Sequence, residues 1–262
     1  MSLESNRLPQ KRTGVWNIWR RSFLQFRRSW LSNTFWILLE PLFILLALGY
    51  GLGAFVSNIQ GVAYIDFFFP SLLCITSMMV AFFESTYGNF SKLTHQKIYS
   101  VMIQTPLEVD DVVLGEVLWG ATKGTLSAAG VALIAGIFGH LTTLMVIPAL
   151  LVVFVSSFLF SILGMLVISM VKNYDGIIYP TSGLIIPMSL LSGTYFPIEH
   201  LPYGLQYFAY LFPLTHTVAV VRGFILGGTP WWQIFLHICY LVGASLLLLR
   251  WAIHRMDRKL II

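Results

Sequence analysis

The chain has 262 residues, of which 57% are hydrophobic and only 10% are charged, and its formal net charge is +5. So little charge beside so much apolar content excludes an ordinary soluble globular protein and favours a chain that crosses a membrane several times. The positive charge does not indicate a nucleic-acid partner, because the basic residues flank long uncharged stretches and form no basic groove pattern.

The positions of the basic residues predict the orientation of the chain. Seven of the sixteen Lys and Arg residues precede the first apolar stretch, and four follow the last one. Lys and Arg concentrate in the cytoplasmic segments of membrane proteins, so we expect both termini in the cytoplasm. In that topology fifteen basic residues lie in the cytoplasm or at the cytoplasmic end of a span, and Arg222 alone lies on the outer side.

Residues 1–34 are predicted to form a cytoplasmic tail and an amphipathic helix that lies along the membrane surface. Aromatic residues recur there at alternating spacings of three and four, which places them on one narrow helical stripe with arginines beside it. The stripe and its arginines are Trp16, Trp19, Arg20, Arg21, Phe23, Phe26, Arg27, Arg28 and Trp30. Two interpretations fit: a plain topological anchor, or a surface that recruits an anionic amphiphile.

Residues 35–250 are predicted to form the transmembrane domain of an all-α membrane protein. A membrane-spanning helix needs about 20 apolar residues, and six stretches qualify. They run approximately over residues 35–55, 66–86, 118–138, 143–171, 177–196 and 231–250. Residues 251–262 are expected to form a cytoplasmic tail.

The segment between the second and third spans is the longest internal cytoplasmic segment. Residues 88–104 are predicted to form a helix that ends before Thr105-Pro106, since the residue before a proline avoids the helical conformation. A second helix is expected to begin at Glu108, Asp110 and Asp111, whose charges suit a helix N-terminus. The first helix either transmits force to the membrane domain or is a peripheral loop helix.

Four charged residues lie inside or next to the predicted spans, namely Glu40, Glu84, Glu116 and Lys123. Intramembrane charge usually marks function, but each lies within roughly two turns of the cytoplasmic boundary, where snorkelling reduces an insertion cost of about 3 kcal/mol. Glu116 and Lys123 share a helical face and are expected to approach each other. With Pro41, which removes a helical hydrogen bond, these residues are candidates for gating or for the transport pathway; a structural role is the alternative.

Small residues repeat every four positions in the third span, at Gly120, Gly124, Ala128, Ala132 and Gly136. Such a ridge lets another helix approach closely in a lipid environment. The partner is either a second copy of the chain or another helix of the same chain.

The uncharged stretch His200–Val221 is predicted to enter the membrane from the outer side and return. Pro202 and Pro213 interrupt it, and one further crossing would place the C-terminal basic residues outside. We expect two short helices, one opening near Pro202 and one capped by Thr215 and ended by Gly227.

The sequence contains no catalytic constellation. A metalloprotease motif, clustered Cys and His residues and a nucleophile elbow are all missing. The stretch Gly115–Gly120 has the glycine spacing of a phosphate-binding loop, but Ala121-Thr122 follows it in place of Lys-Ser/Thr. We therefore expect no metal and no cofactor on this chain, and any ATP hydrolysis must come from another polypeptide.

Several ordered sequence blocks resemble the ABC-2 type permeases, the membrane subunits of ATP-binding-cassette exporters, and in particular the permeases of rhizobial nodulation-factor exporters, which move lipo-oligosaccharides. The blocks are LLEPLFILLALGYGLGAF (38–55), FESTYGNF (83–90), TPLEVDDVVLGEVLWGATKG (105–124), LSGTYFPIEHLP (191–202) and FPLTHTVAVVRGFILGG (212–228). The resemblance covers most of the chain from Trp30 to Arg250, and the N-terminal tail departs from it.

The resemblance implies a homodimer in the bacterial inner membrane that engages two copies of a separate ATPase, which bind ATP and Mg. It implies export of an amphiphile, such as a glycolipid, from the inner leaflet. Contacts with the ATPase fall within residues 89–104 and 172–175: Asn89, Lys92, Gln96, Lys97, Tyr99, Met102, Lys172 and Asp175. It also implies re-entrant outer helices, with candidate residues Tyr195, Phe196, Pro197, His216 and Arg222.

Other classes of protein fit the sequence less well. An exporter of small hydrophobic compounds or drugs shares the same family features. An ion-coupled secondary transporter usually has two related halves and midplane binding groups, and the chain shows no internal repeat. A lipid-modifying membrane enzyme needs a clustered site, for which Glu199, His200 and His216 are the only weak candidates.

Overall fold

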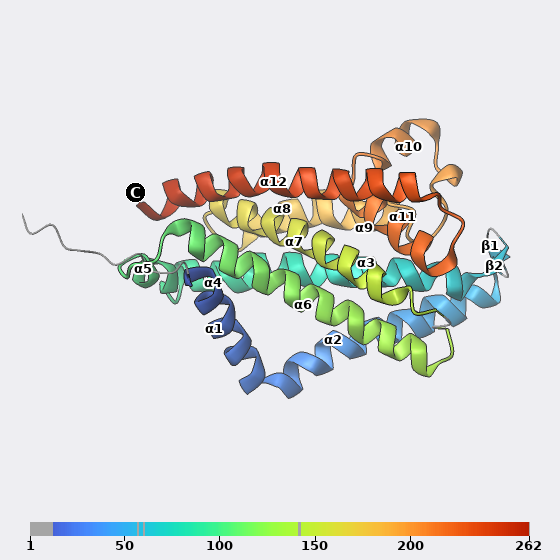
Figure 1. The fold of residues 1–262 in the computed structure, drawn as a ribbon, viewed down its shortest axis with the longest axis horizontal. Helices are drawn as coiled ribbons and strands as arrows, with labels where there is room; N and C mark the ends of the chain where they lie inside the picture. Colours follow the sequence, from blue (N-terminus) through green and yellow to red (C-terminus); the bar gives the residue numbers. More distant parts are fainter. Residues whose placement is uncertain (1–12, 57, 60, 141–142, 262) are drawn as a thin grey trace, which may run out of the picture.

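The computed structural model describes residues 13–56, 58–59, 61–140 and 143–261, and most of these residues belong to helices aligned along one long axis (Figure 1). The expected all-α class is confirmed, apart from one hairpin of two short antiparallel strands, β1 (Asn58–Ile59) and β2 (Val62–Ala63).

The two ends of the bundle differ in what they carry. α1 (Gly14–Arg28) begins and α12 (Trp231–Ile261) ends at the end that also carries α5 (Ile98–Met102), which we call the α5 end (Figure 1). The opposite end carries the β1–β2 hairpin and α10 (Tyr203–Ala209), and we call it the α10 end.

Four helical rods among the described residues are long and apolar enough to cross a bilayer. They are Tyr64–Thr94, Val109–Ile137, Val146–Met170 and Trp231–Leu260, and they correspond to the second, third, fourth and sixth predicted spans. By length and composition, α10 and α11 (Pro213–Leu226), which are bent by 84° from each other, form either a broken span or a re-entrant loop.

The first predicted span lies in a rod that changes its helical type. α2 (Trp30–Ile44) follows α1 after a break at Ser29, so Trp30 belongs to α2 and the predicted surface helix ends at Arg28. The rod continues through the π-helical segment η1 (Leu45–Gly51) and the 3-10 turn η2 (Leu52–Ala54). Pro41 lies inside α2 and leaves the carbonyl four residues earlier without its usual helical partner.

The fifth predicted span is similarly divided. It consists of α8 (Asp175–Pro180), the π-helical segment η4 (Thr181–Ile185) and α9 (Ile186–Leu191). A π-helical segment breaks the regular hydrogen-bond ladder, so it is a place where a helix can change its direction or its packing.

The segment after the second span differs from the prediction. α3 (Tyr64–Phe83) continues through the π-helical segment η3 (Glu84–Gly88) into α4 (Asn89–Thr94), so this end of the span extends beyond the expected boundary. The single helix expected over residues 88–104 is wrong. Lys97 has a left-handed backbone with a φ of 50°, which no continuous helix allows, and a separate five-residue helix, α5, follows it.

The third and fourth spans are continuous helices, α6 (Val109–Ile137) and α7 (Val146–Met170). The acidic start expected for α6 is confirmed, because the Asp111 carboxylate accepts a hydrogen bond from the Glu108 backbone N–H at 3.3 Å and a capping box forms.

The outer hairpin follows the prediction in outline. α10 begins directly after Pro202. α11 ends at Leu226 and is followed by Gly227, whose φ of 78° suits glycine. The expected cap at Thr215 is wrong, because α11 begins at Pro213, and Thr215 Oγ1 instead donates a hydrogen bond to the Ala209 carbonyl at 2.6 Å. Proline suits the first helical position because the backbone there needs no donor.

α12 is the longest helix of the chain that the structure describes, and it extends through the predicted C-terminal tail. Near its end Lys259 Nζ donates hydrogen bonds to the carbonyls of Ile168 and Val171, at 2.6 and 2.7 Å. The C-terminal carbonyls of α7 lack helical partners, and a lysine is well suited to satisfy them.

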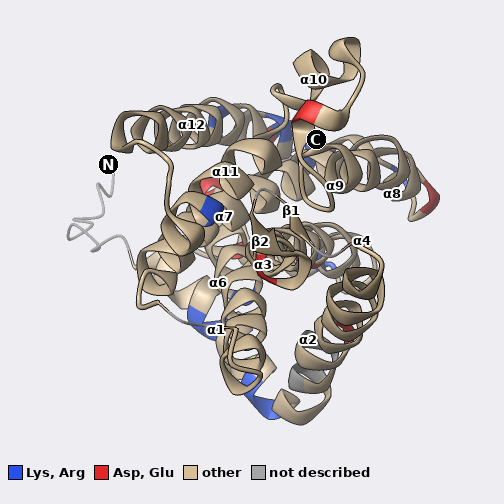
Figure 2. Ribbon diagram, turned by 90° about the vertical axis from the view of Figure 1, so that its right-hand side faces the viewer, with Lys and Arg blue, Asp and Glu red and all other residues tan. Residues whose placement is uncertain are grey.

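α3 lies at the centre of the bundle when the molecule is viewed along its axis (Figure 2). Its neighbours include α6, α7 and α11, which explains why both faces of this helix are apolar and buried. The small-residue ridge of α6 provides one of these contacts: a Cβ added at Gly124 would lie 2.6 Å from the Ser77 carbonyl of α3. The ridge therefore packs within the chain at Gly124, while Gly136 at its far end is exposed.

Candidate functional site

The surface helix α1 docks on the N-terminal half of α6. Ile18 is almost completely buried there, and it occupies the space that a Cβ would fill at Gly115. Trp19 Nε1 donates a hydrogen bond to Thr122 Oγ1 at 3.0 Å. A glycine that admits a β-branched side chain explains why α1 lies close to α6 at this point.

A buried carboxylate joins three helices at this contact. Glu116 of α6 is fully buried and pairs with Arg21 of α1 at 2.8 Å and with Lys92 of α4 at 2.7 Å. Lys92 Nζ also donates to Asn89 Oδ1 at 2.9 Å, and the Asn89 amide donates to Met165 Sδ at 3.2 Å. The network fixes the position of α1 relative to the end of the second rod.

A second ion pair lies about two helical turns further along α6. Lys123 pairs with Glu84 of η3 at 2.7 Å, and Trp119 Nε1 donates to the same carboxylate at 2.9 Å. The expected approach of Glu116 to Lys123 is therefore wrong. Each of them instead pairs with a residue of the second rod, because Gly120 and Gly124 of α6 bring that rod within reach.

The aromatic stripe of the surface helix is divided between two environments. Trp19, Phe23 and Phe26 surround Trp119 of α6, with ring centroids at 6.5, 6.5 and 5.6 Å. Trp16 and Trp30 remain 58% and 59% exposed. The arginines outside the Glu116 network are also exposed: Arg20, Arg27 and Arg28.

These contacts border a two-part groove, which we call the inner groove. Its polar part has a volume of about 320 Å³ and is lined by residues that include Gln25 and Lys92. Its apolar part has a volume of about 340 Å³ and is lined by residues that include Leu126 and Phe154. Three residues line both parts: Phe26, Trp119 and Lys123. A polar site that adjoins an apolar one in this way suits an amphiphilic molecule.

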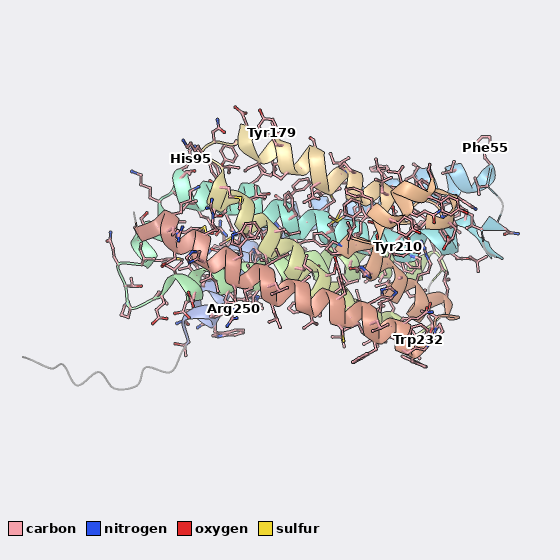
Figure 3. All side chains as sticks on the ribbon, turned by 90° about the horizontal axis from the view of Figure 1, so that it is seen from above. Phe55, His95, Tyr179, Tyr210, Trp232 and Arg250 are labelled. Carbon is pink, nitrogen blue, oxygen red and sulfur yellow. The ribbon has the colours of Figure 1, made fainter. Side chains whose placement is uncertain are left out.

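The two segments predicted to contact an ATPase lie together. Tyr174, in the turn before α8, packs its ring against Phe90 at 4.8 Å and stacks on His95 at 5.5 Å. His95 and Arg250 both lie towards the left-hand end of the bundle in Figure 3, which is the α5 end. The two segments therefore form one surface.

The predicted contact residues differ in exposure. Asn89, Lys92 and Tyr99 are buried, so they cannot touch a soluble partner in this conformation. Burial raises the pKa of Tyr99 well above its usual value, and the nearby Glu116 charge acts in the same direction. Met102 is half-buried. The remaining residues are exposed: Gln96, Lys97, Lys172 and Asp175.

Glu40 lies apart from both ion pairs. Its side chain is exposed on α2, and no ion pair joins it to the residues that the structure describes. Its neighbour Pro41 is buried.

The residues predicted near the outer exit lie at the α10 end. Tyr195 stacks on Phe68 at 5.6 Å, and its carbonyl accepts a hydrogen bond from the Tyr64 hydroxyl. Phe196 is exposed and Pro197 is buried. His216 Nδ1 lies 2.7 Å from His237 Nδ1.

Arg222 reaches from α11 into the bundle. Its Nη2 donates to the Ser71 hydroxyl at 2.5 Å and to the Gly193 carbonyl at 3.0 Å, with a longer contact to the Phe67 carbonyl. Its guanidinium carbon lies 3.8 Å from the centre of the Phe67 ring. Arg222 thus connects α11 with α3 and with the loop that follows α9.

Sequence reasoning missed a second polar chain at the α10 end. The Tyr50 hydroxyl lies 3.0 Å from His140 Nε2, and His140 Nδ1 lies 2.9 Å from Asp66 Oδ1. These residues come from three separate segments, and no local spacing marks them as partners. The described part of the chain contains no group of three or more His, Cys, Asp or Glu side chains that could hold a metal ion.

Comparison with known proteins shows similarity along most of the chain. The family described as ABC-2 type transporter matches residues 13–226. Nodulation protein J of Rhizobium leguminosarum bv. viciae is 34% identical over 84% of this chain and 85% of the relative. Nodulation protein J of Rhizobium meliloti (strain 1021) is 32% identical over 87% of this chain and 89% of the relative. The inner membrane transport permease YadH of Escherichia coli (strain K12) is 20% identical over 80% of this chain and 82% of the relative.

Proposed function

Since the chain belongs to the ABC-2 type transporter family, we propose that it is the permease of an exporter that moves an amphiphile from the inner leaflet outward. Members of this family are multi-pass membrane subunits that work with an ATP-binding partner. The amphiphile is a glycolipid, a lipo-oligosaccharide or another lipid-linked molecule. The similarity to nodulation protein J supports this substrate class.

In the proposed orientation the α5 end faces the cytoplasm of a bacterial cell and the α10 end faces outward across the inner membrane. The basic residues near both termini support this orientation. The rods α2–η2 and α8–α9 then complete six spans, and the bent pair α10–α11 re-enters from the outer side.

The inner groove is the observation that carries the substrate class. An amphiphile in the inner leaflet can place its polar head near Lys92 and its apolar chain near Leu126 without leaving the membrane surface. Ser22 Oγ, which lines the polar part, is buried without a hydrogen-bond partner among the described residues. A polar head in the groove would supply that partner.

The coupling surface is proposed to include Gln96, Lys97, Lys172 and Asp175, which are exposed around Tyr174. Two ATPase subunits, each with ATP and Mg, would dock on a homodimer of this chain. A movement of α4 would displace Lys92 and, through their ion pair, Glu116. Glu116 also pairs with Arg21 of α1, so the movement would extend to α1. The ion network therefore offers a route from ATPase closure to the groove.

The function is tested by reconstituting the chain in nanodiscs with a candidate ABC ATPase from the same organism and measuring ATP hydrolysis. We expect a lipid-linked oligosaccharide to stimulate hydrolysis several-fold, and a lipid of the same chain length without the saccharide to stimulate it less. If no ATPase binds the chain, or if no amphiphile changes the hydrolysis rate, the proposed function is wrong.

A substitution in the apolar part of the groove tests the site itself. Replacing Leu126 with Ser removes apolar surface from the groove and should raise the amphiphile concentration for half-maximal stimulation by about fivefold to tenfold, since burying a leucine side chain contributes about 1.5–3 kcal/mol and only part of it would be buried here.

Leu133→Ser is the matched control. Leu133 lies seven residues further along α6, is also exposed, and does not line the inner groove. Equal effects of the two substitutions on the stimulation curve would show that the groove does not hold the amphiphile.

A further inference from the structure

A pocket of about 430 Å³ opens at the α10 end, and we call it the outer pocket. Its walls come from the loop after α9, from η5 (Ile198–His200), from α11 and from the beginning of α12. Tyr210, which lines the pocket, lies at this end of the molecule, as does Trp232 of α12 (Figure 3). The volume falls in the range of pockets that bind small molecules.

Arg222 lines this pocket with part of its hydrogen-bonding capacity unused. Nη2 takes all the contacts with oxygen atoms described above, while Nε is buried without any partner among the described residues. Buried donors in folded proteins normally have partners, so an unpaired one suggests a ligand or ordered water.

A second buried atom in the lining is also unpaired. Ser192 Oγ has no partner among the residues described, and it lies beside Gly193, whose carbonyl binds Arg222. Further along the lining, the side chains of Glu199, Thr229 and Gln233 make no hydrogen bond with the described part of the chain. The Thr229 hydroxyl and the Gln233 amide can each donate and accept hydrogen bonds.

The histidine pair adds an acceptor. His216 Nε2 lies 3.0 Å from the Tyr210 carbonyl, which can only accept, so this nitrogen carries the proton. In the neutral pair His216 Nδ1 must then accept from the His237 Nδ1–H at 2.7 Å. His237 Nε2 consequently has no proton and can accept a hydrogen bond. His237 is one of the residues that line the outer pocket.

The charges in the lining decide between classes of ligand. Arg222 and Glu199 are the only fully charged side chains among the lining residues, so their formal charges cancel. An anion would meet the Glu199 carboxylate, and a cation would meet the Arg222 guanidinium. Hydroxyl groups, by contrast, can accept from Arg222 and Gln233 and donate to Glu199 and His237.

From this lining we infer that the outer pocket is a binding site for a neutral saccharide, which receives the sugar part of the exported molecule on the outer side. This inference rests on the proposed function for the source of the saccharide. The site itself requires only the side chains of the α10 end.

The test measures binding of a neutral tetrasaccharide to the purified chain in nanodiscs by saturation-transfer NMR and calorimetry. No ATPase is added. We expect saturable binding that Gln233→Leu weakens about fivefold, the effect of losing one or two hydrogen bonds of ordinary strength. Tyr210→Phe should weaken it about threefold, since the Tyr210 hydroxyl makes no other hydrogen bond with the described residues.

Tyr207→Phe is the matched control, because Tyr207 lies three residues earlier on α10, is 76% exposed and does not line the pocket. Unchanged elution and tryptophan fluorescence establish that each variant is folded. The inference is overturned if the unsubstituted chain binds no tetrasaccharide, or if Gln233→Leu and Tyr207→Phe behave alike. Preferential binding of phosphate or sulfate also overturns it.

A lipid-linked tetrasaccharide distinguishes this pocket from the inner groove. Binding that requires the lipid and responds to Leu126→Ser, but not to Gln233→Leu, assigns the saccharide to the groove and overturns the inference. ATP hydrolysis is measured separately. Amphiphile-stimulated hydrolysis without tetrasaccharide binding leaves the proposed function standing, and tetrasaccharide binding without ATPase coupling leaves the pocket standing.

Discussion

Replacing Glu116 with Ala is expected to lower the free energy of unfolding by about 3–5 kcal/mol, the usual cost of removing one member of a buried ion pair. Glu116 is fully buried and receives both Arg21 and Lys92. Its loss leaves Lys92 buried without its ion-pair partner. Unfolding in mixed detergent micelles measures the change. Limited proteolysis should show cleavage near α1, whose contacts with α6 include the ion pair between Arg21 and Glu116.

Asp110→Ala is the control on the same helix. Asp110 is exposed at the start of α6 and makes no ion pair with the described residues, so its removal should leave stability close to that of the unsubstituted chain. If Glu116→Ala is as stable as Asp110→Ala and α1 remains resistant to protease, the ion network does not hold α1 in place.

The second large effect is expected at Gly124. A Cβ there would lie 2.6 Å from the Ser77 carbonyl and 2.8 Å from Ser157 Oγ, so the backbones of α3 and α6 would have to separate. Gly124→Val should therefore cost about 3 kcal/mol, at the upper end of the usual range for overpacking. The same unfolding measurement applies, and ATPase stimulation should fall together with the yield of folded protein.

Gly243 provides the comparison, because an added Cβ there meets nothing within 4 Å. Gly243→Val should change stability by less than about 1 kcal/mol, since only the helix propensity differs. Similar losses for both glycines would mean that the approach of α3 to α6 is not tight in the folded protein.

The helices themselves could be predicted from the sequence because their signals are local. The apolar stretches predicted the long rods. Glu108 and the acidic residues that follow it predicted the start of α6. Pro202 and Gly227 marked the ends of the outer hairpin. Each of these signals depends on residues within a few positions of one another.

The partners of the buried charges could not be predicted in the same way. Glu116 and Lys123 share one face of a helix, which suggested a contact within α6. The close approach of α3 through Gly120 and Gly124 offered better partners, Glu84 and Lys92, and this approach is a property of two helices packed together. The Tyr50–His140–Asp66 chain could not be predicted for the same reason. Tyr50 and His140 are 90 positions apart in the sequence, and His140 and Asp66 are 74 apart.

The prediction of a single helix after the second span was wrong because of the backbone conformation of one residue. Its residues have ordinary helix propensities, but Lys97 adopts a left-handed conformation and divides the segment. α5, which follows this break, places Tyr99 fully buried in a hydrophobic cluster with Phe90 and Val113. Tertiary packing overrode local preference.

The rods of this bundle differ in mechanical stiffness. The rods α2–η2, α3–α4 and α8–α9 each contain a π-helical segment, at which the ladder of hydrogen bonds is interrupted. α12 has no such segment over its 31 residues, so it is a single beam of about 46 Å. It carries Gln233 and His237 near one end and Lys259, which binds the end of α7, near the other. A movement of α12 at the outer pocket would therefore displace its other end, at the α5 end of the bundle, by a similar amount. The rods with π-helical segments could instead accommodate such a movement by a local change in their hydrogen bonding.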